Sequence, residues 1–234
     1  MKDAKSGTFR EGVHDAVPIM LGYVPIGIAY AIIARQGGMS TAETVLMSLL
    51  VYAGASQIMA AGMLAQGAAA AVIVLATFLL NLRHLIMSLC VNNRLRGASL
   101  GGRMLGSGLV TDESFAVFTT AAPEKCTLSY YLGMALAAYF AWAASSLVGS
   151  LVTDLLPTIL SASLGIALYA MFIALLLPHL RGNARLGLLV LLTALCNWGL
   201  GKCMAASWAL IISTLLCAFV GLFFVDPGEE ARDA

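Results

Sequence analysis

One long apolar run of this sequence contains an arginine. Residues 68–80 and 85–91 are almost entirely apolar, and Asn81-Leu82-Arg83-His84 lies between them. The combined run of about 24 residues is long enough to cross a bilayer as a helix. An arginine inside such a helix costs roughly 2.5–3.5 kcal/mol on insertion scales. Arg83 therefore needs a partner, a ligand or a watery cavity, unless it lies near a helix end and reaches the headgroups.

The composition of the whole chain agrees with this interpretation. The 234 residues are 60% hydrophobic and 11% charged, whereas about 25% of a soluble domain is charged. At ~20 residues per crossing, the sequence predicts an all-α, polytopic integral membrane protein with six to eight transmembrane helices. We expect one domain over residues 1–234, with a short tail at 1–12 and an acidic tail at 226–234. The net charge of +1 provides no basic face for nucleic acid.

Eight hydrophobic segments are expected, at residues 13–34, 42–65, 68–91, 104–121, 129–152, 163–180, 184–200 and 206–225. The first contains Pro18 and Pro25, each close to a glycine, and is expected to be kinked or interrupted. The fourth is marginal because it contains Thr111-Asp112-Glu113-Ser114. It either crosses the membrane or forms a short re-entrant helix. If it crosses, lysine and arginine number seven on the N-terminal side and five on the other, which slightly favours a cytoplasmic N-terminus; if it does not cross, this bias reverses.

A faint internal repeat runs through the sequence. Tyr52-Ala53 is followed by Thr77 and Asn81, and Tyr169-Ala170 is followed by Thr193 and Asn197, at offsets of 117 and 116 residues. Many secondary transporters are built from two repeats, contain interrupted helices and bind substrate where the repeats meet. The pattern therefore predicts a two-fold internal repeat.

Gly54, Ser56 and Gln57 lie in the middle of the second segment. The small residues permit close helix packing, which is one interpretation. The other is a helix break whose free backbone groups bind the charged ends of a substrate. Packing alone does not require Gln57, whose amide needs partners in hydrocarbon, so we place these three residues at a substrate site.

Asp112 and Glu113 are adjacent carboxylates near a membrane segment. One is suited to a substrate ammonium group and one to a proton taken up during transport. The alternative is a helix start, with Thr111 or Asp112 as the N-cap. Because intramembrane charges usually pair, we also expect Arg83 to pair with Asp112 or Glu113.

Asn81 and Asn197 either line a central site or join helix to helix, and His84 is either a proton relay or a packing residue. The sequence contains no HExxH, no phosphate-binding loop and no CxxC pair. We therefore expect no enzyme activity, no metal and no cofactor.

The motifs occur in a characteristic order: Tyr52-Ala53-Gly54-Ala55-Ser56-Gln57, Asn81-Leu82-Arg83-His84 and Thr111-Asp112-Glu113, with Phe9-Arg10-Glu11-Gly12 before them and Ala170-Met171-Phe172-Ile173-Ala174-Leu175-Leu176 after them. On these residues the chain resembles the AzlC family of branched-chain amino acid permeases. The resemblance implies a multi-pass bacterial inner-membrane protein that exports hydrophobic amino acids with a small AzlD-type membrane subunit. One departure is that Gly165–Tyr169 stands where such proteins often carry an intramembrane aspartate.

The polar residues within apolar segments predict a secondary transporter, and the resemblance implies branched-chain or related amino acids as its substrates. We expect the substrate near Gly54–Gln57 and Asn81–Arg83, with its carboxylate at Arg83 or the helix break and its ammonium at Asp112 or Glu113. The alternatives are a non-transporting membrane scaffold subunit and a transporter of a different small zwitterionic solute.

Overall fold

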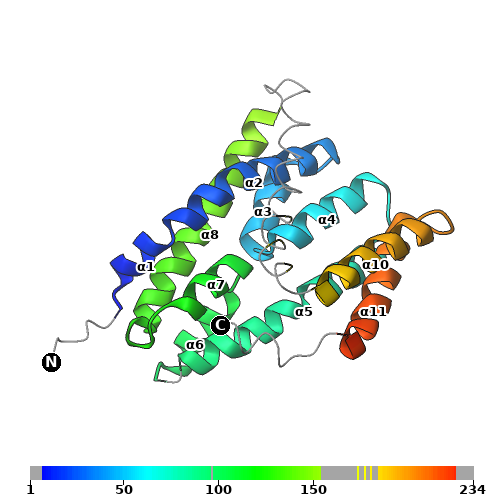
Figure 1. The fold of residues 1–234 in the computed structure, drawn as a ribbon. Coiled ribbons are helices and arrows are strands. Elements are labelled where there is room, and N and C mark those ends of the chain that lie inside the picture. Colours follow the sequence, from blue (N-terminus) through cyan, green and yellow to red (C-terminus); the bar gives the residue numbers. More distant parts are fainter. Residues whose placement is uncertain are drawn as a thin grey trace.

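The computed structural model describes residues 7–95, 97–153 and 184–224, together with Ile173, Leu177 and Leu180. Within these ranges the structure is helical and contains no strand (Figure 1). Three helices are long and apolar enough to cross a membrane: α2 (Val17–Gln36), α5 (Ala70–Arg94) and α8 (Leu128–Val152). The predicted all-α, polytopic fold is confirmed.

The first hydrophobic segment is interrupted near its start. A short helix, α1 (Phe9–Asp15), begins with a capping box between Thr8 and Glu11 and ends at Ala16, where α2 begins. Pro18 lies in the first turn of α2, where a missing amide proton costs nothing, and Pro25 lies inside the helix. The predicted interruption is thus present, and residues 9–12, expected in a tail, are helical.

Helices α1 and α2 pack against α8 at very short range. A β-carbon on Gly12 would lie 2.0 Å from the Tyr130 carbonyl oxygen, and one on Gly149 would lie 2.7 Å from the Ile28 Cα. Residue numbers rise together along this contact, so α2 and α8 run parallel. Small residues allow such an approach, which is how helices associate in membranes.

The second segment folds as a helical hairpin instead of a single crossing. Helix α3 (Thr41–Leu50) starts next to the end of α2, and α4 (Gly54–Ala65) returns to the same end, where a β-carbon on Gly37 would lie 3.2 Å from the Cβ of Ala65. We call α3, Val51–Ala53 and α4 the first hairpin, with residues 51–53 as its tip. The predicted helix break is therefore present, directly before Gly54.

The fourth segment folds in the same way. Helix α6 (Leu100–Gly108) runs back along α5, so that the Ser88 hydroxyl donates to the Ser107 carbonyl at 2.9 Å. Helix α7 (Asp112–Thr120) then runs outward, and Arg94 donates to the Phe118 carbonyl at 3.2 Å. A single helix over 104–121 is thus wrong, and the re-entrant alternative matches this second hairpin, whose tip is residues 109–111. A short 3₁₀ turn, η1 (Pro123–Lys125), leads to α8.

The two hairpins belong to two similar units. Each hairpin precedes a helix of 25 residues, and the bounds of α5 and α8 differ by 58 residues at both ends. Leu50-Val51-Tyr52 at the first tip corresponds to Leu109-Val110-Thr111 at the second. Because a hairpin returns to its starting side and a long helix crosses, the second unit is inverted relative to the first (Figure 1). The repeat predicted from Tyr169 lies outside the described residues.

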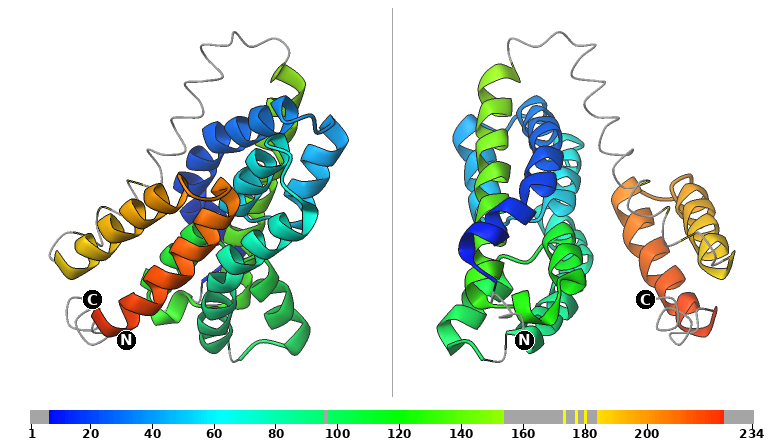
Figure 2. Two further views of the ribbon diagram at one scale, coloured as in Figure 1. Left: turned by 90° about the vertical axis from the view of Figure 1, so that its right-hand side faces the viewer. Right: turned by 60° about the vertical axis from the view of Figure 1, so that its left-hand side comes forward.

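Helices α10 (Ala184–Leu200) and α11 (Ala206–Phe224) match the last two predicted segments. They form an antiparallel pair in which Gly221 lies against Leu189, and α11 contacts α5 (Figure 2). Most of the segment expected at 163–180, and the acidic tail at 226–234, lie outside the described residues.

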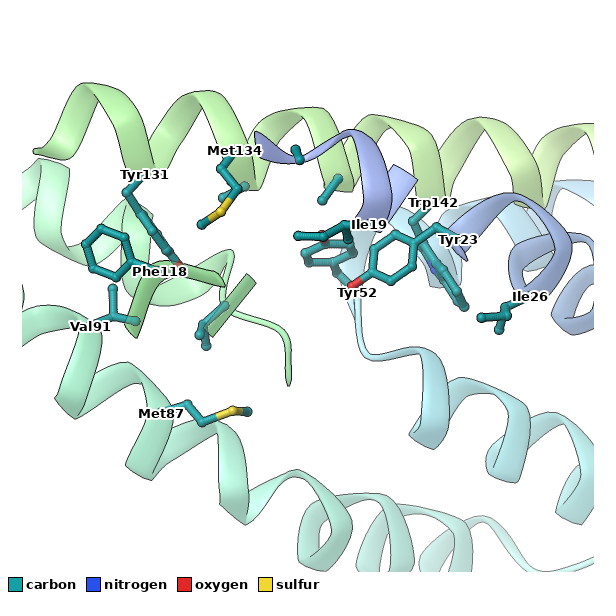
Figure 3. Packing of buried hydrophobic residues seen from close by; sticks show 14 of the residues in the cluster. Ile19, Tyr23, Ile26, Tyr52, Met87, Val91, Phe118, Tyr131, Met134 and Trp142 are labelled. Atoms are coloured by element: carbon teal, nitrogen blue, oxygen red, sulfur yellow. The ribbon is translucent and has the colours of Figure 1, made fainter. Parts of the chain in front are cut away.

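The core lies where α2, α8 and the hairpin tips meet. Tyr23, Tyr52 and Trp142 are buried side by side there (Figure 3), and the rings of Tyr23 and Trp142 form an edge-to-face pair with centroids 5.3 Å apart. The outside of the molecule is apolar instead of polar: Leu85 and Ile86 on α5 are more than 60% exposed. This is the surface of a multi-pass membrane protein, whose exposed side chains face lipid.

Candidate functional site

The tips of the two hairpins meet beside α2. The Tyr23 hydroxyl is hydrogen-bonded to Glu113 Oε2 at 2.7 Å and to Thr111 Oγ1 at 2.9 Å. Tyr52, at the other tip, is buried next to Tyr23. Residues from three separate parts of the sequence thus form one polar centre among apolar helices.

Arg83 forms an ion pair with Asp112. The Arg83 Nη1 to Asp112 Oδ2 distance is 2.9 Å, and both side chains are about one third exposed. The hypothesised pairing is confirmed, with Asp112 as the partner. Thr111 is the N-cap of α7, so the predicted helix start is present as well, and the positive end of α7 stabilises the Asp112 carboxylate.

Both polar side-chain atoms of Gln57 are hydrogen-bonded within the protein. Its Oε1 accepts from the Ala53 backbone amide and from Trp142 Nε1, both at 3.1 Å, and its Nε2 donates to Ser48 Oγ at 3.1 Å. The side chain is fully buried. The protein itself thus supplies the hydrogen-bond partners that the Gln57 amide needs in a bilayer. In this conformation Gln57 links the first tip to α8.

Gly54, Ser56 and Asn81 hold the start of α4 in place. A β-carbon on Gly54 would lie 2.8 Å from the Trp142 ring, so this position accepts only glycine without displacing the ring. Ser56 donates to the Ala53 carbonyl at 2.9 Å and accepts from Asn81 Nδ2 at 3.1 Å. Asn81 Oδ1 is buried and accepts no hydrogen bond from the described residues.

A pocket of about 430 Å³ lies between α4, α5 and α11. Its lining is Ala55, Ile58, Met59, Ala76, Leu79, Leu80, Arg83, Leu210, Ile211 and Thr214. Apart from Thr214, the rest of the lining is apolar, so Arg83 brings the one charge to it, and Arg83 also belongs to the ion pair with Asp112. The arrangement suits a small ligand with a charged end and an aliphatic body.

Sequence reasoning missed the contribution of α11 to this pocket. Leu210, Ile211 and Thr214 lie in an ordinary apolar segment. Their residue types do not distinguish a pocket wall from a surface that faces lipid, so no signal in the sequence identified them.

Two further candidates contribute less to this cluster: Asn197 makes no described contact with it, whereas His84 lies close enough to Arg83 and Asp112 for electrostatic interaction. Asn197 is half-buried on α10, which packs against α11, and it does not line the pocket. His84 neighbours Arg83 in sequence, and its buried Nε2 has no partner among the described residues. Over the same part of the chain, no three His, Cys, Asp or Glu side chains converge as metal ligands.

A serine-hydrolase pattern is also present in the chain, at Gly97-Ala98-Ser99-Leu100-Gly101. The catalytic version of that pattern requires a strand-to-helix turn with an exposed serine. Here Ser99 is the N-cap of α6, and its hydroxyl accepts from the Gly102 amide at 3.3 Å. The motif therefore serves as a helix cap.

The protein-family profile described as AzlC protein matches residues 18–156 of the chain. The match includes α2, both hairpins, α5 and α8, and therefore the whole polar centre. No solved structure is significantly similar to the chain.

Relatives are found in both archaea and bacteria. An uncharacterized membrane protein of Archaeoglobus fulgidus is 33% identical over 182 residues, or 77% of this chain and 80% of the relative. The inner membrane protein YgaZ of Escherichia coli is 27% identical over 234 residues, or 96% and 95%. The branched-chain amino acid transport protein AzlC of Bacillus subtilis is 26% identical over 145 residues, or 61% and 57%.

Proposed function

The chain belongs to the AzlC family, and on that premise we propose that it exports branched-chain or related hydrophobic amino acids across a bacterial inner membrane. The printed name of the Bacillus subtilis relative, a branched-chain amino acid transport protein, supports this substrate class. The inner-membrane name of the Escherichia coli relative supports the location.

The observation that carries the proposal is the junction of the apolar pocket with the Arg83–Asp112 ion pair. A zwitterionic amino acid offers a carboxylate to Arg83 and an ammonium group to Asp112, so it replaces the ion pair without leaving either charge unpaired. Its aliphatic side chain occupies the pocket, beside Ile58 and Ile211. Longer aliphatic side chains exclude more water from this pocket and bind more tightly.

The other predicted site residues take different roles in this proposal. The free Oδ1 of Asn81 accepts from the substrate ammonium, and Ser56 orients Asn81. Gly54 and Gln57 shape the first tip around the site. Asn197 stays a prediction from sequence.

A small AzlD-type membrane subunit completes the exporter in this proposal, as family membership suggests. The long helix α5 supports the need for a partner, because only 11% of its most apolar stretch is buried. A short apolar subunit that covers α5 would shield the helix that carries Arg83.

Amino acid efflux from cells tests the proposal. Bacteria without their own exporters are loaded with dipeptides of leucine, isoleucine, valine or methionine, and the chain is expressed with and without the small subunit. Faster efflux that requires both subunits supports a two-component exporter and ranks the substrates. Unchanged efflux, in cells where both proteins are inserted, favours the scaffold alternative.

The same efflux assay distinguishes a variant that has lost the proposed substrate site from one that is merely misfolded. Arg83→Ala is expected to reduce efflux strongly, whereas Arg10→Ala, at an exposed position of α1, is expected to leave it unchanged. Normal efflux by correctly inserted Arg83→Ala protein would exclude the proposed site. A wild-type protein that moves a different zwitterion and none of the four amino acids would redefine the substrate.

A further inference from the structure

The Tyr52 hydroxyl lies near the Tyr23 hydroxyl and Thr111 but forms no hydrogen bond of normal geometry with any described residue, although the side chain is only 6% exposed. A buried hydroxyl without a partner is costly and is uncommon in folded proteins. Tyr52 has a φ of 43°, the only positive φ outside glycine in the described part of the chain, and this conformation turns the chain at the first tip. Figure 3 shows its ring beside that of Tyr23.

Both phenols interact with the carboxylate of Glu113. Tyr52 and Tyr23 both lie close enough to Glu113 for electrostatic interaction, and the Tyr23 hydroxyl is 2.7 Å from Glu113 Oε2. Glu113 forms no ion pair with any described residue, because the cation at this site, Arg83, pairs with Asp112. Adjacent carboxylates thus have different surroundings, one beside a cation and one between two phenols.

We propose that Glu113 carries the proton that is exchanged for the amino acid, with Tyr23 and Tyr52 as its two hydrogen-bond partners. This inference rests on the proposed function. The structure shows Glu113 accepting a hydrogen bond from Tyr23, as an ionised carboxylate would. In the protonated state of the proposal, Glu113 donates from its second oxygen to Tyr52, whose hydroxyl then gains a well-formed hydrogen bond. Only an O–H bond forms and breaks: the proton enters from water on one side and leaves to water on the other.

The position of Glu113 explains how substrate and proton affect each other. Asp112 and Glu113 share the first turn of α7, so a substrate that draws Asp112 away from Arg83 also moves Glu113 relative to Tyr23. The two sites are therefore coupled through one turn of helix. Couplings of this kind between sites typically change affinity by 5- to 150-fold.

Other titratable groups face this centre from the elements that pack around it. They are Tyr23 on α2, Tyr52 at the first tip, Asp112 on α7, Arg83 and His84 on α5, and Tyr131 on α8. Arg83 and Asp112 neutralise each other until substrate arrives, which leaves His84 as the rival proton carrier. The experiment must therefore separate Glu113 from His84.

The test uses the full chain, with the small subunit if exchange requires it, reconstituted in liposomes with radiolabelled leucine. Leucine–leucine exchange reports substrate binding and translocation, and leucine uptake driven by a pH gradient reports coupling to protons. Glu113→Gln is neutral and nearly isosteric, so we expect exchange close to wild type and a loss of about tenfold or more in the pH-gradient effect. Glu124→Gln, at an exposed position of η1, is the matched control and is expected to keep both activities.

A second pair of variants tests the tyrosine. Tyr52→Phe removes only the hydroxyl and is expected to shift the pH dependence of driven uptake while exchange persists. Tyr30→Phe removes another buried hydroxyl, which donates to the Thr44 carbonyl at 3.0 Å instead of facing Glu113, and is expected to shift nothing. A purely structural role of Tyr52 would reduce exchange and driven uptake together and would contradict the proposal.

The outcomes separate this inference from the proposed function. Wild-type protein that exchanges no amino acid overturns both. Wild-type protein that exchanges leucine but ignores the pH gradient, or follows a sodium gradient instead, overturns only the proton proposal. The same holds if Glu113→Gln keeps its response to the pH gradient while His84→Gln loses it.

Discussion

At the scale of single residues, Arg83 shows how a charge is accommodated inside an apolar helix. The sequence predicted that it needs a partner, and Asp112 lies 2.9 Å away, 29 positions later. Sequence alone did not decide between Asp112 and Glu113. That choice depends on where the second tip ends, since one residue of difference turns a side chain by about 100° around the helix.

The ion pair makes a prediction for stability. Arg83→Ala and Asp112→Ala are each expected to destabilise the protein, because each leaves the other charge without its partner in a poorly hydrated place. The double variant is expected to lose less than the sum, with a coupling of about 1 kcal/mol. Thermal unfolding of the three variants in detergent measures it, and additive losses would mean that the two charges do not interact.

The size of the pocket makes a prediction for specificity. Ile211→Trp on α11 fills space that we assign to the aliphatic side chain of the substrate. Leucine and isoleucine efflux is expected to fall more than valine efflux, because the larger substrates lose more room. Ile212→Trp, at the exposed neighbouring position, is the control. An equal loss for all substrates would place the side chain elsewhere.

Asp15 gives a prediction for pH. The Tyr130 hydroxyl donates to Asp15 Oδ2 at 2.8 Å, and this hydrogen bond, ahead of other causes, lowers the pKa of Asp15 below its ordinary value of 3.8. A lowered pKa contributes stability above 3.8, and that contribution is lost as the pH falls through the native pKa. Tyr130→Phe is therefore expected to cost about 1 kcal/mol at neutral pH and progressively less in acid. Melting temperatures across pH measure the difference, and a constant deficit would exclude the carboxylate as its origin.

At the scale of elements, hydropathy predicted where the apolar segments lie but not how many times they cross. Two helices of about ten residues and one crossing helix require similar lengths of apolar sequence, so residues 42–65 look the same in either case. The visible sign of the second hairpin is a capping residue within an apolar run: Thr111 caps α7, and a helix that simply crossed would need no cap there. The first hairpin shows no such sign, because α4 begins without a side-chain cap.

The helix contact between α2 and α8 makes a prediction at this scale. A β-carbon on Gly27 would lie 2.0 Å from Ser145 Oγ, whereas one on Gly22, in the same helix, meets nothing within 4 Å. Gly27→Ala is expected to destabilise the protein by about 1–3 kcal/mol through overpacking. Gly22→Ala is expected to be neutral or slightly stabilising, because alanine favours a helix. Thermal unfolding of the two variants compares them, and equal effects would mean that the contact is not tight.

At the scale of the whole molecule, the two hairpins change which basic residues are expected on each side of the membrane. Because neither hairpin crosses, the linkers that follow α5 and α7 lie on the side of the N-terminus. Arg94, Arg103 and Lys125 therefore join Arg10 on that side, and Arg35 is the basic residue at the other ends of α2, α5 and α8. For the part of the chain from α1 to α8, the excess of basic residues is on the side of the N-terminus, and the positive-inside rule predicts that this side faces the cytoplasm.

Cysteine labelling in intact cells tests this orientation. Gln66→Cys and Glu124→Cys are exposed at opposite ends of the molecule and are made in protein without its five native cysteines. An impermeant maleimide is expected to label residue 66 in intact cells and residue 124 only after permeabilisation. The reverse pattern would invert the molecule.

The close contact of α1 and α2 with α8 has a mechanical consequence. Where two backbones are in direct contact, neither helix can slide or rotate against the other without a steric clash. We therefore expect α1, α2 and α8 to move as one rigid body. The pocket lies outside this rigid body, between α4, α5 and α11. Little of α5 is buried within the chain. We expect α1, α2 and α8 to stay in place while α5 and α11 move during transport, so that the side of the pocket that carries Arg83 is the mobile one.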